Sequence, residues 1–263
     1  ANPAEQRQFW DDDAVQLLES ACASLFTMGE PRYGALVVDE AQDFAELWWY
    51  ALFPLIEDGE NGQVFVFMDL AQSLRANASP PPIKFPAHYS LNINCRNTKK
   101  IARLSANLVP LETFSPAGAP AGVDVRMLRA TAPAQQAGLV ANELRRMLEM
   151  ERLTPHQIVL IGPASKDRGS LSRLNEVDGT RIVTSAADWR AGKGILCTTA
   201  RSFKGLESDV VIVYDLAALG TGFTSADLYV ACSRARHVLV LVTHDERLRS
   251  ILEKAEAASR LNA

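Results

Sequence analysis

The chain has 263 residues, of which 48% are hydrophobic and 22% are charged, and its formal net charge at pH 7 is −4. These values are typical of a globular protein with one large domain or two small ones, and they exclude a basic surface that would hold nucleic acid over the whole molecule. No apolar run is long enough to cross a membrane and the N-terminus lacks a signal-peptide pattern, so we expect a cytoplasmic protein with no membrane partner.

Charge is distributed unevenly along the chain, and the cysteine spacing indicates how the thiols are used. Residues 1–110 carry 8 basic and 14 acidic side chains, whereas residues 111–263 carry 19 and 17, which permits a local basic groove in the second half. The four cysteines, at positions 22, 95, 197 and 232, have no metal-ligand spacing. We therefore expect small buried thiols in a reducing compartment.

In the first half of the chain, a helix is predicted over residues 13–26 from its apolar spacing. Short β-branched runs predict strands at 35–38 and 64–68. A further strand is predicted to reach Cys95, where a turn precedes a helix. The uncharged, Pro- and Gly-rich segment 115–122 is the best candidate linker. We expect the domains to be residues 1–112 and 113–263.

The second half alternates strands with helices. Helices are predicted over 133–150, 227–236 and 245–260, and near-continuous apolar strands over 157–161, 194–198, 209–214 and 238–242. Such strands suit a parallel sheet that is covered on both faces. The fold class is therefore predicted to be α/β, with parallel sheets, flanking helices and right-handed crossovers.

Two predicted strands end in polar side chains. Asp39 and Glu40 follow the strand at 35–38, and Asp69 and Gln72 follow the strand at 64–68. Open α/β sheets bind ligands at the carboxyl ends of their strands, and carboxylates there suit Mg²⁺ and the positioning of water. Acidic residues are also favoured at helix N-termini, so a purely structural role for the pair stays open.

Three further segments combine strand ends, hydroxyls and arginines. Arg96 lies in a turn before a predicted helix whose N-cap is Asn97 or Thr98. Its guanidinium could form a bidentate contact with a phosphate. Residues 198–209 join two strands. Arg234 lies near the end of the predicted helix at 227–236, where a basic residue also suits the helix dipole.

Taken together and in this order, the five segments resemble the motifs of superfamily 1 DNA helicases of the UvrD/Rep kind. Residues 35–43, which include Asp39-Glu40-Ala41-Gln42, resemble the Walker B motif, and residues 67–73, which include Asp69-Leu70-Ala71-Gln72, resemble the Asp-x-x-Gln motif that follows it. Residues 91–98 resemble the Asn-aromatic-Arg-Ser-Thr motif. Residues 198–207 resemble Thr-x-His-x-x-Lys-Gly-Leu-Glu, and residues 229–235 resemble Tyr-Val-x-x-(Thr/Ser)-Arg-Ala.

The resemblance implies two RecA-like lobes, the first partial and the second complete, with ATP and Mg²⁺ between them. The implied nucleotide contacts are Mg²⁺ binding by Asp39, water activation by Glu40, γ-phosphate sensing by Gln72, transition-state stabilisation by Arg96 and Arg234, and ribose contact by Glu207. The implied contacts with single-stranded or partly duplex DNA are Thr199, Arg201 and Ser202. Lys204 and Gly205 would lie in the loop that links these residues to the nucleotide.

The chain departs from this family in several ways. The phosphate-binding sequence Gly-x-x-x-x-Gly-Lys-Ser/Thr is absent, Cys95 replaces an aromatic residue, and Arg201 replaces a histidine. We therefore expect the C-terminal portion of a helicase, inactive alone, with the P-loop in the missing part of the first lobe. An upstream domain of the same protein is a further expected partner.

Two other interpretations stay open. One is a degenerate, non-catalytic module of the same fold that binds nucleic acid or a protein. The other is an unrelated metabolic α/β enzyme.

Overall fold

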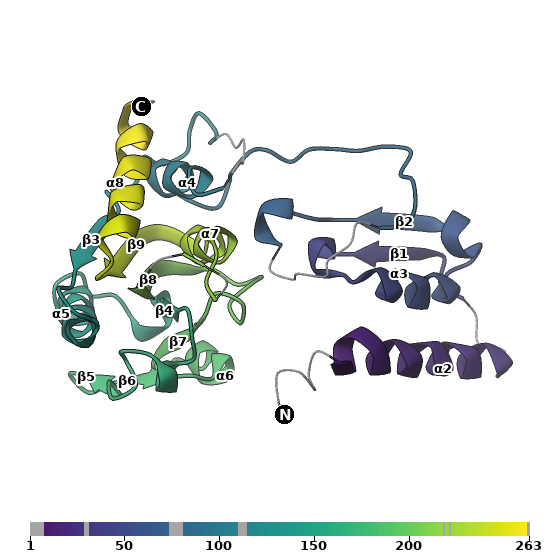
Figure 1. The fold of residues 1–263 in the computed structure, drawn as a ribbon, viewed down its shortest axis with the longest axis horizontal. Coiled ribbons are helices and arrows are strands. Elements are labelled where there is room, and N and C mark those ends of the chain that lie inside the picture. The colour runs from purple at the N-terminus through teal and green to yellow at the C-terminus, as the bar shows by residue number, and fades with distance from the viewer. Residues whose placement is uncertain are drawn as a thin grey trace. The chain divides into compact units, whose positions relative to one another are not determined.

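The computed structural model describes residues 8–28, 32–73, 81–109, 115–217, 219–220 and 222–261, without the side chains of residues 11, 60, 70, 247 and 255–261. The chain divides into two compact units, residues 1–90 (unit 1) and residues 91–263 (unit 2) (Figure 1). The lobe boundary predicted at 112/113 lies further along the chain than this division. Among the described residues no helix is both long and apolar enough to cross a lipid bilayer.

Unit 1 is built around two parallel strands. After a π-helical turn at Phe9–Asp13, its elements are α2 (Ala14–Thr27), β1 (Ala35–Val38), α3 (Glu46–Leu52) and β2 (Gln63–Val66), with short 3₁₀ turns between them. The strands pair in parallel, Ala35 with Gln63 and Val38 with Val66. Because side chains alternate along a strand, one face packs on the core formed by Val38, Trp49 and Phe53, while Val37 and Phe65 lie on the other face and are exposed.

Unit 2 contains a seven-stranded sheet. Its helices are α4 (Lys99–Ala106), α5 (Gln136–Glu149), α6 (Ala186–Arg190), α7 (Ser225–Ser233) and α8 (Glu246–Leu261). Its strands are β3 (Arg126–Arg129), β4 (Ile158–Gly162), β5 (Glu176–Val177), β6 (Thr180–Val183), β7 (Ile195–Thr199), β8 (Ser208–Leu216) and β9 (Ala235–Thr243). The strand order is β3-β9-β8-β4-β7-β6-β5, and all pairs are parallel except β5 with β6.

Helices cover both faces of this sheet, as its apolar strands require. The buried residues Val140, Leu144 and Met147 of α5 pack against one set of alternating strand residues, including Leu160 and Ile212. On the opposite face, α4 lies against both α7 and α8, and all three helices contact β9 (Figure 1). The α/β class and the mainly parallel sheet predicted from the sequence are therefore confirmed.

Two local predictions were wrong. Residues 91–95 form no strand beyond a single bridge residue at Ile93, because this segment crosses into unit 2 without running along a neighbouring strand. The helix expected to reach residue 236 ends at Ser233, and Ala235 and Arg236 already belong to β9, where Ala235 pairs with Ser208. Sheet pairing has overridden the local helical pattern there.

The predicted linker is part of unit 2. The backbone N–H groups of Lys99 and Lys100 donate hydrogen bonds to the carbonyls of Pro120 and Ala121, at 3.0 and 3.2 Å. The N–H groups in the first turn of a helix have no acceptor within the helix. Here the carbonyls of segment 115–122 accept from them in place of a capping side chain. The segment therefore caps α4.

The centre of the unit 2 sheet holds a tight contact between neighbouring strands. A Cβ atom at Gly162 would lie 2.6 Å from Cζ of Tyr214, and the Tyr214 hydroxyl lies 3.2 Å from Sγ of Cys197. Burial raises the pKa of Tyr214 far above its ordinary range, with Cys197 and Asp215 adding to the effect. The phenol is therefore a neutral part of the core.

Gly162→Ala is predicted to destabilise unit 2 by about 1–3 kcal/mol, because the added methyl group forces the Tyr214 ring out of its packed position. Urea denaturation followed by circular dichroism measures the loss, and hydrogen exchange of peptides from β4 and β8 assigns it to unit 2. Gly138→Ala is the matched control: it lies in α5 with no neighbour near its added Cβ, so a gain of about 0.5–1 kcal/mol is expected.

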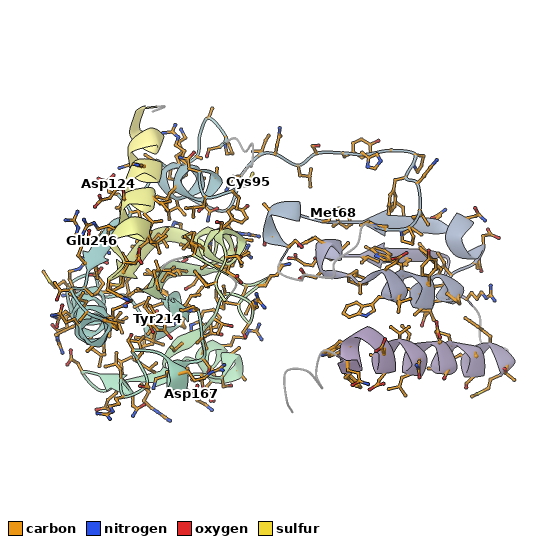
Figure 2. The ribbon with its side chains drawn as sticks, viewed as in Figure 1. Met68, Cys95, Asp124, Asp167, Tyr214 and Glu246 are labelled. Atoms are coloured by element: carbon orange, nitrogen blue, oxygen red, sulfur yellow. The ribbon has the colours of Figure 1, made fainter. Side chains whose placement is uncertain are left out.

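The cysteines differ in reactivity, and one departs from the sequence prediction. Cys22, Cys197 and Cys232 are buried, but Cys95 is exposed on the segment before α4 (Figure 2). Burial also raises the pKa of the Cys197 and Cys232 thiols, which disfavours the reactive thiolate.

Iodoacetamide is predicted to label Cys95 in the native chain at least about a hundredfold faster than Cys197 or Cys232, which need unfolding to become accessible. Peptide mass spectrometry with time points in buffer and in denaturant measures the ratio. Equal native rates for Cys95 and Cys232 would contradict the burial that the structure assigns.

Candidate nucleotide and nucleic-acid sites

In unit 1, the loops that follow β1 and β2 are joined by their backbones. The N–H of Phe67 donates to the carbonyl of Val38 at 2.8 Å, and the N–H of Ala41 donates to the carbonyl of Phe67 at 3.0 Å. These bonds continue the pairing beyond the strands. They bring the two polar strand ends to one edge of the sheet, as the sequence predicts for a parallel pair.

A chain of side-chain hydrogen bonds then connects the two loops. Nε2 of Gln42 donates to the carboxylate of Glu40, and Oε1 of Gln42 accepts from the backbone N–H of Asp69 at 2.8 Å. Oδ2 of Asp69 accepts from Nε2 of Gln72 at 2.6 Å. Glu40 and Gln72, two predicted site residues, thus belong to one network.

Gln42 and Asp69 were not predicted as site residues, although both lie in the quoted motifs. Gln42 is only 4% exposed, and both ends of its amide are engaged, so its orientation is fixed. The available signal was its place three residues after Asp39, which puts an amide at the edge that β1 and β2 share.

The two adjacent carboxylates after β1 have different surroundings. Asp39 is exposed, and its Oδ1 accepts from the backbone N–H of Glu40 at 2.8 Å. Glu40 adopts the left-handed conformation, with φ of 53°, which is uncommon for a residue other than glycine. This turn leaves the Asp39 carboxylate toward solvent while the Glu40 carboxylate meets Gln42.

The ends of β1 and β2 offer few side-chain ligands for a metal ion. Within the described residues, no group of three or more His, Cys, Asp or Glu side chains is placed to hold a metal ion. A cation at Asp39 would therefore take most of its ligands from water and from a bound phosphate. This donor set fits Mg²⁺, which keeps several waters and binds through one or two carboxylates.

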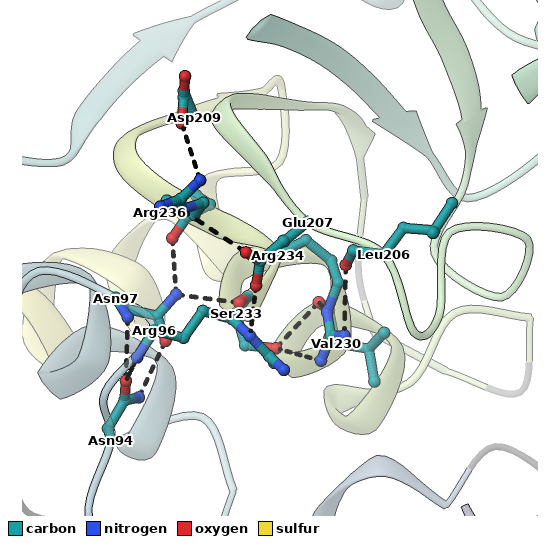
Figure 3. A network of polar contacts seen from close by, with 11 residues as sticks. Asn94, Arg96, Asn97, Leu206, Glu207, Asp209, Val230, Ser233, Arg234 and Arg236 are labelled. Carbon is teal, nitrogen blue, oxygen red and sulfur yellow. Dashed lines mark hydrogen bonds and ion pairs between the residues drawn. The ribbon is translucent and has the colours of Figure 1, made fainter. Parts of the chain in front are cut away.

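In unit 2, the buried amide of Asn97 holds the segment that carries Arg96. Nδ2 of Asn97 donates to the carbonyls of Ser233 and Ala235, at 2.9 and 2.6 Å (Figure 3). The backbone N–H of Thr98 donates to the carbonyl of Arg236 at 3.1 Å. The segment is therefore attached to the junction between α7 and β9.

Arg96 is the first member of a row of alternating charges (Figure 3). Its Nε lies 3.0 Å from Oε2 of Glu207, and the other oxygen of Glu207 lies 3.6 Å from Nε of Arg236. Nη1 of Arg236 lies 3.6 Å from Oδ1 of Asp209. Arg236 and Asp209 were not predicted, and the sequence gives no pattern that would single them out.

Arg234 lies beside this row but is buried, with 1% of its surface exposed. Nε donates to the carbonyl of Val230 at 3.2 Å, Nη1 to the carbonyl of Leu206 at 3.4 Å, and Nη2 to Oγ of Ser233 at 3.2 Å. The carbonyl of Leu206 ties the arginine to the residue just before Glu207. The structure therefore brings together Arg96, Glu207 and Arg234.

The residues predicted to contact nucleic acid lie at the end of β7 and in the turn that follows it. Oγ1 of Thr199 donates to Oγ of Ser202 at 3.0 Å, and Phe203 is fully buried against the ring of Trp189. Gly205 has a φ of +79°, which a glycine adopts without strain. Lys204 and Gly205 connect this turn to Leu206.

These residues lie apart from the charged row along the sheet. Thr199 ends β7, whereas Glu207 precedes β8 and Arg234 precedes β9. Because the strands are parallel, Thr199 is at the carboxyl edge of the sheet and the other two are at its amino edge. Unit 2 therefore presents two groups of predicted site residues, joined by the segment 200–206.

Many solved structures match the chain, and the two described below are of low sequence identity. No protein-family model and no curated protein matches the chain. The C-terminal domain of a possible DNA helicase from Lactobacillus plantarum WCFS1 is 22% identical over 62% of this chain and 95% of that chain, with a TM-score of 0.46. An arterivirus helicase, nonstructural protein 10, in complex with DNA is 16% identical over 84% of this chain and 42% of that chain, also with a TM-score of 0.46.

Asn97→Ala is predicted to lower the free energy of unfolding of unit 2 by about 1–3 kcal/mol, because two buried carbonyls lose their donor. Urea denaturation with hydrogen exchange of peptides from α4 and β9 measures the effect. Asn142→Ala is the matched control, since its amide is exposed on α5 and accepts a bond from Arg145, and a change within about 0.5 kcal/mol is expected. Equal effects of the two changes would contradict the anchoring role of Asn97.

Proposed function

We propose that this chain is part of an ATP-dependent, UvrD/Rep-like superfamily 1 DNA helicase or translocase, with a partial first and a complete second RecA-like lobe. The observation that carries the proposal is the convergence of motifs far apart in sequence. Arg96 contacts Glu207 at 3.0 Å, and Asn97 of the same motif binds Ser233, next to Arg234. An unrelated α/β enzyme does not predict that these segments lie together.

We propose the nucleotide roles that the resemblance implies, and the two polar networks support them. Asp39 would hold Mg²⁺, and Glu40, oriented by Gln42, would position the attacking water. The bound Mg²⁺ would neutralise charge on the ATP phosphates. Gln72 would respond to the terminal phosphate. In unit 2, Arg96 and Arg234 would stabilise the negative charge of the transition state, and Glu207 would contact the ribose. Lys204 and Gly205 would lie in the loop that links the nucleic-acid contacts to the nucleotide.

Unit 1 has a surface that suits a further segment of such a lobe. Val37 and Phe65 are paired across the two strands and lie on one face, and they are 63% and 52% exposed. Parallel sheets are normally covered on both faces, so an apolar segment that packed here would bury these two side chains and stabilise the lobe. We propose that the P-loop-bearing part of the lobe covers this face, because the chain itself lacks the P-loop sequence.

The charge distribution supports nucleic-acid binding by unit 2. Residues 91–263 carry 23 basic and 17 acidic side chains, a net of +6, whereas residues 1–90 carry 4 and 14, a net of −10. Single-stranded or partly duplex DNA would bind the basic unit, with Thr199, Arg201 and Ser202 near the strand. The cytoplasmic location stays a prediction.

The absence of the P-loop sequence favours a second candidate, a non-catalytic module that binds nucleic acid or a protein. Both candidates predict salt-sensitive binding of single strands if nucleic acid is the ligand. They differ in ATP hydrolysis once a P-loop-bearing segment is present. Only the helicase candidate predicts turnover that nucleic acid stimulates.

The 263-residue chain alone is predicted to hydrolyse ATP hardly at all, and full turnover by this chain would contradict the proposal. In a protein with the P-loop-bearing segment restored, Glu40→Gln is predicted to lower DNA-stimulated ATP hydrolysis about a hundredfold or more, because the water loses its carboxylate. A coupled phosphate-release assay measures the rate. Glu46→Gln, at the exposed start of α3, is the control and should keep the rate.

Arg234→Ala in the same protein is predicted to abolish DNA-stimulated hydrolysis, because charge in the transition state loses a stabilising arginine. Circular dichroism and ATP affinity accompany the rate measurement, since Arg234 also makes buried hydrogen bonds. A folded variant with the wild-type rate would contradict the assigned role.

A further inference from the structure

We infer that Asp227, a buried residue in the first turn of α7, is a positioning residue for Arg201 in nucleic-acid binding. This inference rests on the proposed function, because it requires Arg201 to contact the nucleic acid. Oδ1 of Asp227 lies 3.2 Å from Nε of Arg201. The Asp227 side chain is only 3% exposed, whereas the Arg201 side chain is 59% exposed.

The position of Asp227 is set independently of Arg201. Its Oδ2 accepts hydrogen bonds from the backbone N–H and the hydroxyl of Thr224, at 2.9 and 2.8 Å. In return, Oγ1 of Thr224 accepts from the backbone N–H of Asp227 at 3.2 Å. This reciprocal capping box fixes the carboxylate on a nine-residue helix. One oxygen caps the helix, and the other remains for Arg201.

The contact leaves Arg201 able to bind a ligand. Asp227 engages Nε, so the two terminal nitrogens, which suit a phosphate, are not part of this bond. A long arginine side chain loses conformational freedom when it binds, and a side chain held in advance loses less. The backbone beneath it is also anchored, because Phe203 is buried and the carbonyl of Leu206 accepts from Arg234.

A competing role predicts the opposite sign. If Asp227 only competed with phosphate for Arg201, its removal would tighten DNA binding. Removal of one negative charge near a polyanion would also tighten binding by long-range electrostatics. A positioning role predicts weaker binding in spite of the lost negative charge.

The test is fluorescence anisotropy with a labelled oligodeoxythymidine of about 20 nucleotides, longer than one binding site, over a series of salt concentrations. Arg201→Ala is expected to weaken binding about tenfold and to reduce the slope of log K against log salt by about one. Asp227→Asn is expected to weaken binding about threefold to tenfold with a similar slope change. The double variant should bind like Arg201→Ala alone, because both changes remove the same contact.

Two controls separate positioning from folding and from net charge. Thr224→Ala removes the two bonds of the hydroxyl but keeps the backbone N–H that donates to Oδ2 of Asp227. The carboxylate therefore keeps one anchor, so this variant should lower the melting temperature yet keep DNA affinity. Asp178→Asn makes the same charge change in an exposed ion pair with Arg145 and should not weaken binding. Loss of affinity in Thr224→Ala equal to that in Asp227→Asn would assign the effect to helix stability and overturn the inference.

The remaining outcomes separate a failure of the positioning role of Asp227 from a failure of the nucleic-acid role of Arg201. If Arg201→Ala weakens binding but Asp227→Asn binds as well as or better than the wild type, the positioning role is wrong and the proposed function stands. If Arg201→Ala has no effect, or if the wild-type chain does not bind the oligonucleotide, the assigned nucleic-acid role of Arg201 fails and the inference fails with it.

Discussion

The two hydrogen bonds from the Asn97 amide to the carbonyls of Ser233 and Ala235 attach the chain that enters unit 2 to the junction between α7 and β9. The next residue, Thr98, extends this attachment through its backbone bond to Arg236. Because Asn97 is buried, these bonds are shielded from water and both carbonyls depend on them. The contact of Arg96 with Glu207 follows from this anchoring, since it places residue 96 at the edge where β8 begins.

Unit 1 uses an amide in a similar way. Gln42 joins the carboxylate of Glu40 to the backbone of Asp69, and Asp69 in turn holds Gln72. In both units a neutral side chain that donates and accepts connects segments that carry charge. An amide can do this without the desolvation cost of a buried ion. Asp39, Arg96 and Glu207 can then remain at the surface, where a ligand can meet them.

Helix α7 connects the two groups of predicted site residues in unit 2. Asp227 in its first turn contacts Arg201, and Arg234 at its end contacts the carbonyl of Leu206. The segment 201–206 is therefore held at both ends by one short helix. In the proposed helicase, a change at the nucleic-acid contact and a change at the nucleotide contact would both act on this helix.

The sequence by itself determined the α/β class, the main strands of the sheet and the polar strand ends, because β-branched apolar runs and the residues that follow them are local features. It could not show that residues 91–95 form no strand, that the segment 115–122 caps α4, or that Cys95 is exposed. Only the tertiary structure decided the partners of Arg96, Gln42 and Arg201. Hydrogen bonds between residues up to 138 positions apart depend on how the strands are ordered, and no local pattern encodes that order.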